Sequence, residues 1–253
     1  MRFPRPVGRA IRYAALLTGL AALAACQTTG NRQPKPVNTS VVSVQGTAIP
    51  VHLDGNYCIV PDRGGYEDFE RKIWRSIQNA NRDNRQLLFF IYCDDYRTIQ
   101  GSAYIQALAS EGGIKVALKD GRILQYSGSL PTYLSAIIRN MDNSDQTESS
   151  AKFQERVAEN QRNLGIYNSR HLSNVERTRK VDEDAVGAYF RTRYRISAAN
   201  GAREHVQITG YTMREGLILR AYVVVVPGTQ NEILALDTVK RLIHGIHDSS
   251  GTI

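Results

Sequence analysis

The sequence predicts an α+β fold in which a mainly antiparallel sheet packs against helices. Strand-like runs are interspersed with amphipathic, helix-like stretches, and no internal repeat is present. Near the end of the chain, three long strand-like runs over 186–226 are separated by Asn200-Gly201 and Glu215-Gly216, which are typical hairpin turns. A length of 253 residues, with 42% apolar and 22% charged, excludes a disordered or collagen-like chain.

The first half of the chain contains several strand-like runs. Two of them, 41–44 and 49–53, flank Gln45-Gly46 and predict a hairpin. Further runs cover 56–60 and 87–93. Because the run at 87–93 is apolar on both faces, we expect a strand that is covered on two sides.

The middle of the chain is less regular. Two weaker strand-like runs, 103–109 and 114–118, are separated by Glu111-Gly112-Gly113, which we interpret as a break. Lys119-Asp120-Gly121-Arg122 predicts a turn. From 166 to 184 the apolar pattern gives way to polar and basic residues. We interpret this segment as a long mobile connection within a polar insertion over 142–184.

Three stretches have apolar residues at the spacing of one buried helical stripe. They cover 66–80, 131–141 and 231–246, and a poorer helix covers 151–163. Pro131 is favourable in the first turn of the second helix. The stripe residues are Tyr66, Phe69, Ile73, Trp74, Ile77 and Ala80; Tyr133, Leu134, Ile137, Ile138 and Met141; and Ile233, Leu236, Val239, Leu242, Ile243 and Ile246.

Residues 1–25 have the composition of a secretory signal peptide. Four arginines and no acidic residue lie within 1–12, and an apolar stretch follows over 13–25. A membrane-spanning helix needs about 20 apolar residues, so we do not expect a permanent span here. Polar residues then predict a flexible spacer over 26–40, followed by a single domain over 41–250.

The end of this leader, Leu23-Ala24-Ala25-Cys26, resembles the lipobox of bacterial lipoproteins. The resemblance implies that the Cys26 thiol receives a diacylglycerol, that the leader is cut just before it, and that the new amine receives an acyl chain such as palmitate. In such lipoproteins, an aspartate directly after the cysteine favours the inner membrane. This chain has Gln27 at that position, which implies the periplasmic face of the outer membrane. The alternative is an ordinary signal peptide that is cut near Ala25 and leaves a terminal thiol.

The remaining cysteines, Cys58 and Cys93, form a pair once Cys26 is assigned to the lipid. The periplasm is oxidising, so we expect them to form a disulfide bond. The alternative is a reactive or metal-binding pair, but the sequence has no CxxC spacing to support it.

The net charge of the chain does not indicate a nucleic-acid partner. It is +8, and removing the four leader arginines leaves a mild +4. The motifs GxSxG, HExxH, GxGxxG and the P-loop are absent from the sequence. We therefore expect no catalytic residue, no cofactor and no metal, and a protein that is not an enzyme.

A stripe of arginines is the most distinctive surface that the sequence predicts. Arg191, Arg193 and Arg195 alternate along a strand-like run, which places them on one sheet face. Guanidinium groups pair with phosphate or carboxylate, so this is a candidate anion-binding face. The alternative is a solvated face that is balanced by acids such as Glu204 and Glu215. Residues of the next two strands expected on the same face are Arg220, Tyr222, His205, Gln207 and Tyr211.

Two smaller constellations have an ordinary structural explanation. His244, His247 and Asp248 could share a metal. The better explanation is that the two histidines lie at the end of a helix, where they interact favourably with the helix dipole. Asp94-Asp95 could serve as paired carboxylates, and a turn or N-cap role is the expected one.

The strand–cysteine–helix–strand opening, with Tyr57-Cys58 and Tyr92-Cys93-Asp94, the meander and the final helix together resemble the PsbP-like α/β/α sandwich over 45–247. This resemblance implies a non-enzymatic adaptor or assembly factor. We therefore expect a lipid-anchored periplasmic protein that binds another envelope protein. The alternatives are an envelope hydrolase, in which His171 would act with Asp94 or Asp95, and a carrier of a lipid or small ligand.

Overall fold

The structure is a computed structural model that describes residues 39–53, 55–60, 78, 83–93, 110–143, 171–174, 176–198 and 201–248. The chain separates into two units after Pro34, and every described residue belongs to the second. Several predictions lie outside these residues. They are the signal peptide with Cys26, the helix over 66–80 apart from Gln78, the run at 103–109, Asp94-Asp95, and the helix over 151–163.

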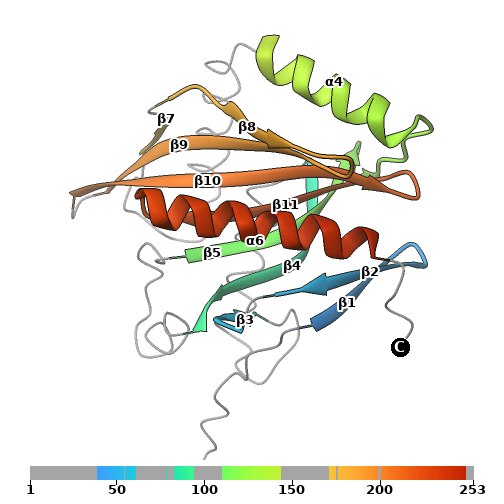
Figure 1. Cartoon of the computed structure of the whole chain (residues 1–253), viewed down its shortest axis with the longest axis horizontal. Helices are drawn as coiled ribbons and strands as arrows, with labels where there is room; N and C mark the ends of the chain where they lie inside the picture. Colours follow the sequence, from blue (N-terminus) through green and yellow to red (C-terminus); the bar gives the residue numbers. More distant parts are fainter. Residues whose placement is uncertain are drawn as a thin grey trace, which may run out of the picture. The chain divides into compact units, whose positions relative to one another are not determined.

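The described residues form one large antiparallel sheet and a separate hairpin (Figure 1). The hairpin pairs β1 (Thr39–Val44) with β2 (Thr47–His52). Two short strands pair at the side of the main sheet, β6 (Arg122–Ile123) with β5 and β8 (Arg179–Glu183) with β9. The main order is β3 (Tyr57–Ile59), β4 (Asn84–Tyr92), β5 (Ser110–Lys119), β11 (Leu217–Val225), β10 (Gly201–Arg214), β9 (Ala188–Ala198) and β7 (His171–Asn174).

Two helices complete the architecture, α4 (Leu130–Asn143) and α6 (Thr229–His247). One hydrophobic cluster joins α6 and the β1–β2 hairpin to one sheet face, and a second joins α4 to the other face. The predicted α+β class with an antiparallel sheet is therefore confirmed. Across the part of the chain that the structure describes, no helix is long and apolar enough to cross a bilayer.

Tight turns confirm three local predictions. Gln45-Gly46, Asp120-Gly121 and Glu215-Gly216 each have positive φ at both residues, between 50° and 87°. This is the backbone of a two-residue hairpin turn whose twist matches the flanking strands. The last turn joins β10 to β11, so the predicted antiparallel meander of β9, β10 and β11 is also confirmed.

The disulfide between Cys58 and Cys93 confirms the predicted pairing. Cys58 lies in β3, and Cys93 follows β4, the strand that pairs with β3. The strand β4 is buried from Leu88 to Ile91, which confirms that it is covered on both faces. The disulfide thus holds the edge strand of the sheet to a strand of the core.

The predicted break at Glu111-Gly112-Gly113 is wrong, because these residues lie inside β5. A Cβ added to Gly112 would lie 2.5 Å from the Phe90 ring and still closer to the carbonyl oxygen of Tyr222. The glycines therefore allow close approach of neighbouring strands, and they do not end the strand.

The predicted mobile connection over 166–184 is also wrong where the structure describes it. β7 and β8 both pair with β9, so part of the predicted insertion belongs to the sheet. Most side chains of β8 are exposed. The usual alternation of buried apolar residues is therefore missing, and the strand is held by pairing with its neighbour.

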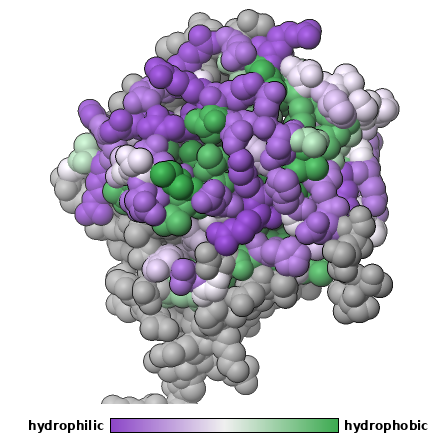
Figure 2. Space-filling model, in the orientation of Figure 1, coloured by the Kyte–Doolittle hydropathy of each residue, from purple (hydrophilic) through white to green (hydrophobic). Residues whose placement is uncertain are grey.

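The two predicted helical stripes that the structure describes, on α4 and α6, are confirmed with one correction. On α4, Tyr133 and Leu134 are buried as predicted. On α6, Ile233 is 50% exposed and does not belong to the buried stripe, whereas Ala235 is buried. The α6 packing against the sheet begins one turn later than the periodicity indicates, because the first turn projects beyond the core. Figure 2 shows mainly hydrophilic residues on the described surface in this view, with smaller hydrophobic patches between them.

Candidate functional site

The predicted arginine face is divided between the two faces of the sheet. Residues directly opposite on paired strands share a face. Arg193 lies opposite Val206, on the face that α6 covers, whereas Arg220 lies opposite Tyr211, on the face that α4 covers. The prediction that these arginines share one sheet face is therefore wrong. The pairing register of the strands differs by one residue from the alignment that a shared face would require.

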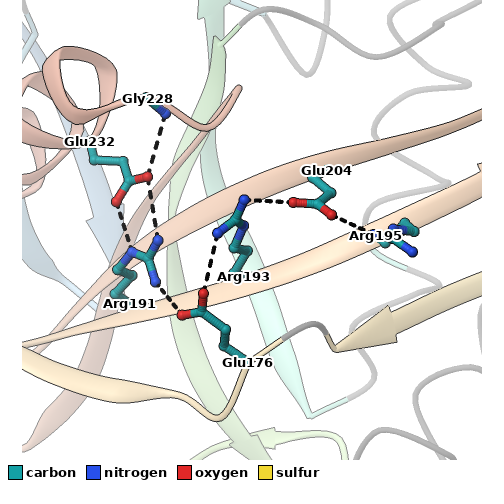
Figure 3. A network of polar contacts seen from close by, with 7 residues as sticks. All are labelled: Glu176, Arg191, Arg193, Arg195, Glu204, Gly228 and Glu232. Carbon is teal, nitrogen blue, oxygen red and sulfur yellow. Dashed lines mark hydrogen bonds and ion pairs between the residues drawn. The ribbon is translucent and has the colours of Figure 1, made fainter.

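On the α6 side, Arg191, Arg193 and Arg195 form what we call the arginine–glutamate network with Glu176, Glu204 and Glu232 (Figure 3). Arg191 donates from Nη1 to Glu176 Oε2 and from Nε to Glu232 Oε2, both at 2.7 Å. Arg193 bridges Glu176 at 3.2 Å and Glu204 at 2.7 Å. Arg195 binds Glu204 at 2.6 Å.

The network is electrically balanced. The hydrogen bond from Arg191 contributes most to lowering the pKa of Glu176, and that from Arg195 contributes most to lowering the pKa of Glu204. Each arginine has at least one carboxylate partner, and Arg193 Nε is the one buried donor of the three that has no acceptor among the described residues. This favours a balanced face over an anion-binding one. Glu204 balances the arginines of this face, as predicted. Glu215 does not, because it lies in a turn and accepts a hydrogen bond from Thr47.

Replacing Arg191 with methionine is expected to lower the free energy of unfolding by about 1 kcal/mol. The side chain is 21% exposed and joins Glu232 of α6 to Glu176, which precedes β8. The matched variant Arg195→Met should have a smaller effect, because this side chain is 49% exposed and solvent screens its ion pair. Urea unfolding of both variants measures the difference, and equal losses would contradict it.

On the α4 side, a second set of residues surrounds Arg220, and we call it the tyrosine–cation cluster: Lys115, Tyr133, Tyr211, Arg220 and Tyr222. Arg220 and Lys115 are directly opposite on β11 and β5. The Arg220 guanidinium carbon lies 5.0 Å from the ring centre of Tyr211, and Lys115 Nζ lies 4.1 Å from that of Tyr222. Both cations therefore rest on aromatic rings, an arrangement that the ring quadrupole stabilises.

Burial shapes the electrostatics of this cluster. Burial and the charge of Arg220 lower the pKa of Lys115 to about 8, against an opposite effect of Glu111. Burial raises the pKa of Glu111 and of Tyr133, because it disfavours the charged form of each group. The cluster therefore holds two cationic side chains and an acid in a poorly solvated place.

Several polar atoms on this face have no hydrogen-bond partner among the residues that the structure describes. They are Arg220 Nε, Tyr133 Oη and both ring nitrogens of His205. His205 stacks on Tyr194, and burial, followed by the charge of Arg203, lowers its pKa. Buried polar groups are rarely left without a partner, so each such atom calls for an explanation.

The remaining residues predicted for this face have partners. The Tyr222 hydroxyl donates to Gln86 Oε1 at 3.4 Å, and Gln207 donates to Thr209 at 2.8 Å. Sequence reasoning missed Lys115, Glu111 and Tyr133. The alternation of Glu111, Gly113 and Lys115 could have revealed two of them, but the two glycines were interpreted as a break.

The two histidines of α6 have separate partners. His244 Nε2 lies 3.0 Å from Asp184 Oδ2, and His247 Nε2 lies 2.7 Å from Thr212 Oγ1. Asp184 also accepts hydrogen bonds from the backbone of the turn before β9. Within the described ranges, no three His, Cys, Asp or Glu residues are grouped closely enough to hold a metal ion. The side chain of His171 lies outside the described part.

Comparison with solved structures finds a likeness in fold. The chain is similar to the solution structure of cyanobacterial PsbP from Synechocystis sp. PCC 6803, with 10% identity, coverage of 86% of this chain and 95% of that chain, and a TM-score of 0.35. This is a weak structural resemblance, and it carries no inference about function. No family model matches the sequence, and no curated protein does.

Proposed function

We propose that the chain is a lipid-anchored, non-enzymatic binding module of the bacterial cell envelope. The single observation that carries this proposal is the Cys58–Cys93 disulfide, because such bonds form and persist in oxidising compartments such as the periplasm. The basic and apolar leader over 1–25 supports the same compartment. The periplasmic face of the outer membrane is the proposed location, and another envelope protein is the proposed partner.

The anchor in this proposal is Cys26. Two acyl chains give stable membrane attachment, at about 0.8 kcal/mol for each buried methylene. The spacer over 26–40 would then connect the lipid to the first strand at Thr39. The folded part would be free to contact partners near the bilayer.

Replacing Cys26 with serine is expected to move the protein from the membrane fraction to the soluble fraction, because serine has no thiol to accept a lipid. Fractionation of cells followed by immunoblotting measures the shift. The matched variant Gln27→Asp keeps the cysteine and should remain in membranes, but in the inner one. Retention of the Cys26→Ser protein in detergent-extractable membranes would refute the anchor, as would an unmodified Cys26 in the mass spectrum of the wild-type terminus.

A carrier of a small ligand is a second candidate function. The tyrosine–cation cluster favours it, because Arg220 Nε and Tyr133 Oη have no partner among the described residues. A carrier orients its ligand with a few polar groups, and a ligand bound here would supply the partners that these two buried atoms lack.

A further inference from the structure

We propose that the outer edge of β1 pairs with the same edge of a second copy of the chain, antiparallel and around a two-fold axis. The two hairpins would then form one four-stranded sheet, with the two β1 strands in its centre. Three observations carry this inference. The edge has backbone groups without partners, it lacks the features that protect other strand edges of this protein, and its sequence can pair with itself.

The outer edge of β1 presents backbone groups that have no hydrogen-bond partner in the described part of the chain. The pairing of β1 is with β2 alone, and the remaining backbone hydrogen bonds of the described residues do not involve β1. The two-residue turn makes Val44 and Thr47 a hydrogen-bonded pair. Because such pairs alternate along the strands, the N–H and C=O groups of Val41 and Ser43 point away from β2. Pro50 lies opposite Val41 and has no N–H, which agrees with this alternation.

Other strand edges of the protein are protected against the addition of a strand. In β8, which pairs with β9 along one side, four of the five residues are charged. The outer edge of β2 contains Pro50, and β3 has only three residues. By contrast, β1 has six residues without a charge or a proline, and Val41 is 49% exposed. Helix α6 contacts β2, and in the view of Figure 1 β1 lies on the side of β2 away from α6. Such an edge favours the addition of a strand.

A second copy of β1 fits this edge by register. Outward-pointing backbone groups must meet each other, so an axis at Val41 places Val41 opposite Val41 of the second copy. This register engages all three residues whose backbone points outward, because it also places Thr39 opposite Ser43 of the second copy. The half-exposed Val41 side chains would then pack on each other as a β-branched pair.

The dimer also agrees with the charge and the size of the hairpin. Identical strands often repel each other through like charges that lie opposite, but β1 carries no charge. The hairpin is a two-stranded sheet that is separate from the main one, and such a sheet gains stability from further strands. Pairing with a second copy would give it four strands.

The first test is a disulfide cross-link at the proposed axis, in the full chain in detergent. The variant Val41→Cys would place two thiols in a hydrogen-bonded pair whose Cα atoms are about 5.5 Å apart, which a disulfide can span. Under mild oxidation it should migrate at twice the monomer mass in non-reducing electrophoresis. The matched variant Ala48→Cys is exposed on β2 and should stay monomeric, because three strand spacings, about 14 Å, would separate its thiols. The wild-type chain measures any link through Cys26.

The second test is sedimentation of the full chain in density-matched detergent, which should show a reversible equilibrium between monomer and dimer. Val41→Lys should raise the dissociation constant at least tenfold, because it opposes two like charges at the axis. Ala48→Lys should change it less than twofold. A chain that is monomeric at all concentrations, a dimer that Val41→Lys leaves unchanged, or equal cross-linking of Val41→Cys and Ala48→Cys would overturn the proposal. Membrane release of Cys26→Ser is measured independently, so the anchor and the dimer fail separately.

Discussion

Replacing both Cys58 and Cys93 with alanine is expected to lower the free energy of unfolding by about 4 kcal/mol. The two cysteines are 35 positions apart, and the bond restricts the unfolded chain over that whole loop. The loss should be large relative to a total stability of about 5–15 kcal/mol. Urea unfolding of the double variant, followed by circular dichroism, measures it.

The matched control for this prediction is Cys26→Ser, which removes the third cysteine of the chain and leaves the Cys58–Cys93 bond intact. Its stability should equal that of the wild-type chain. Treatment of the wild-type protein with a reducing agent should reproduce the loss seen in the double variant. A double variant as stable as wild type would show that the bond does not stabilise the domain.

Replacing Gly112 with alanine is expected to destabilise the protein by about 3 kcal/mol, at the upper end of ordinary overpacking effects. The added Cβ would meet the ring of Phe90 at 2.5 Å and the backbone of β11 at Tyr222. Phe90 is fully buried, and the backbone of a central strand cannot retreat without breaking its pairing. The loss should appear as a lower urea midpoint with an unchanged slope.

A matched control is Ala202→Val, which adds more volume at an exposed position of β10. This variant should remain within about 0.5 kcal/mol of wild type, as is usual for surface substitutions. If Gly112→Ala were as stable as Ala202→Val, β5 would not require a glycine between Phe90 and Tyr222.

The features that could be predicted from the sequence have local causes. A two-residue turn such as Glu215-Gly216 fixes its own backbone, and the apolar run that forms β4 identifies a strand covered on both faces. The helical stripe of α4 follows from spacing alone. The pairing of Cys58 with Cys93 needed one further argument, the oxidising compartment, and no knowledge of the sheet.

The features that could not be predicted depend on distant neighbours. Gly112 and Gly113 look like a break in the sequence. Gly112 is required by Phe90 and by the backbone of β11, which lies more than 100 positions later, and Gly113 is required by Gln86 and by the backbone of Leu88 in β4. β8 shows no apolar alternation, because β9 rather than the core holds it. Only the pairing register could reveal either fact.

The same limit applies to the candidate site. Arg220 and Tyr222 were identified correctly as residues of one polar face, and their assignment to the face of Arg191 was wrong by a single residue of register. The acids that occupy Arg191 come from positions 15 and 41 residues away. Tyr133 reaches the cluster from a helix whose stripe predicts only a core residue. Charge balance between such distant elements is not visible in a local pattern.

The separate β1–β2 hairpin determines how the domain responds to mechanical load at its N-terminal end. Thr39, the first described residue, lies opposite His52 at the open end of the hairpin. Tension on the preceding chain would therefore unzip β1 from β2 one residue pair at a time, which requires much less force than shearing all pairs together. The nine-stranded sheet takes no part in that pairing. The first strand would thus separate before the strands of the main sheet do, and its departure would take Val44 out of the hydrophobic core.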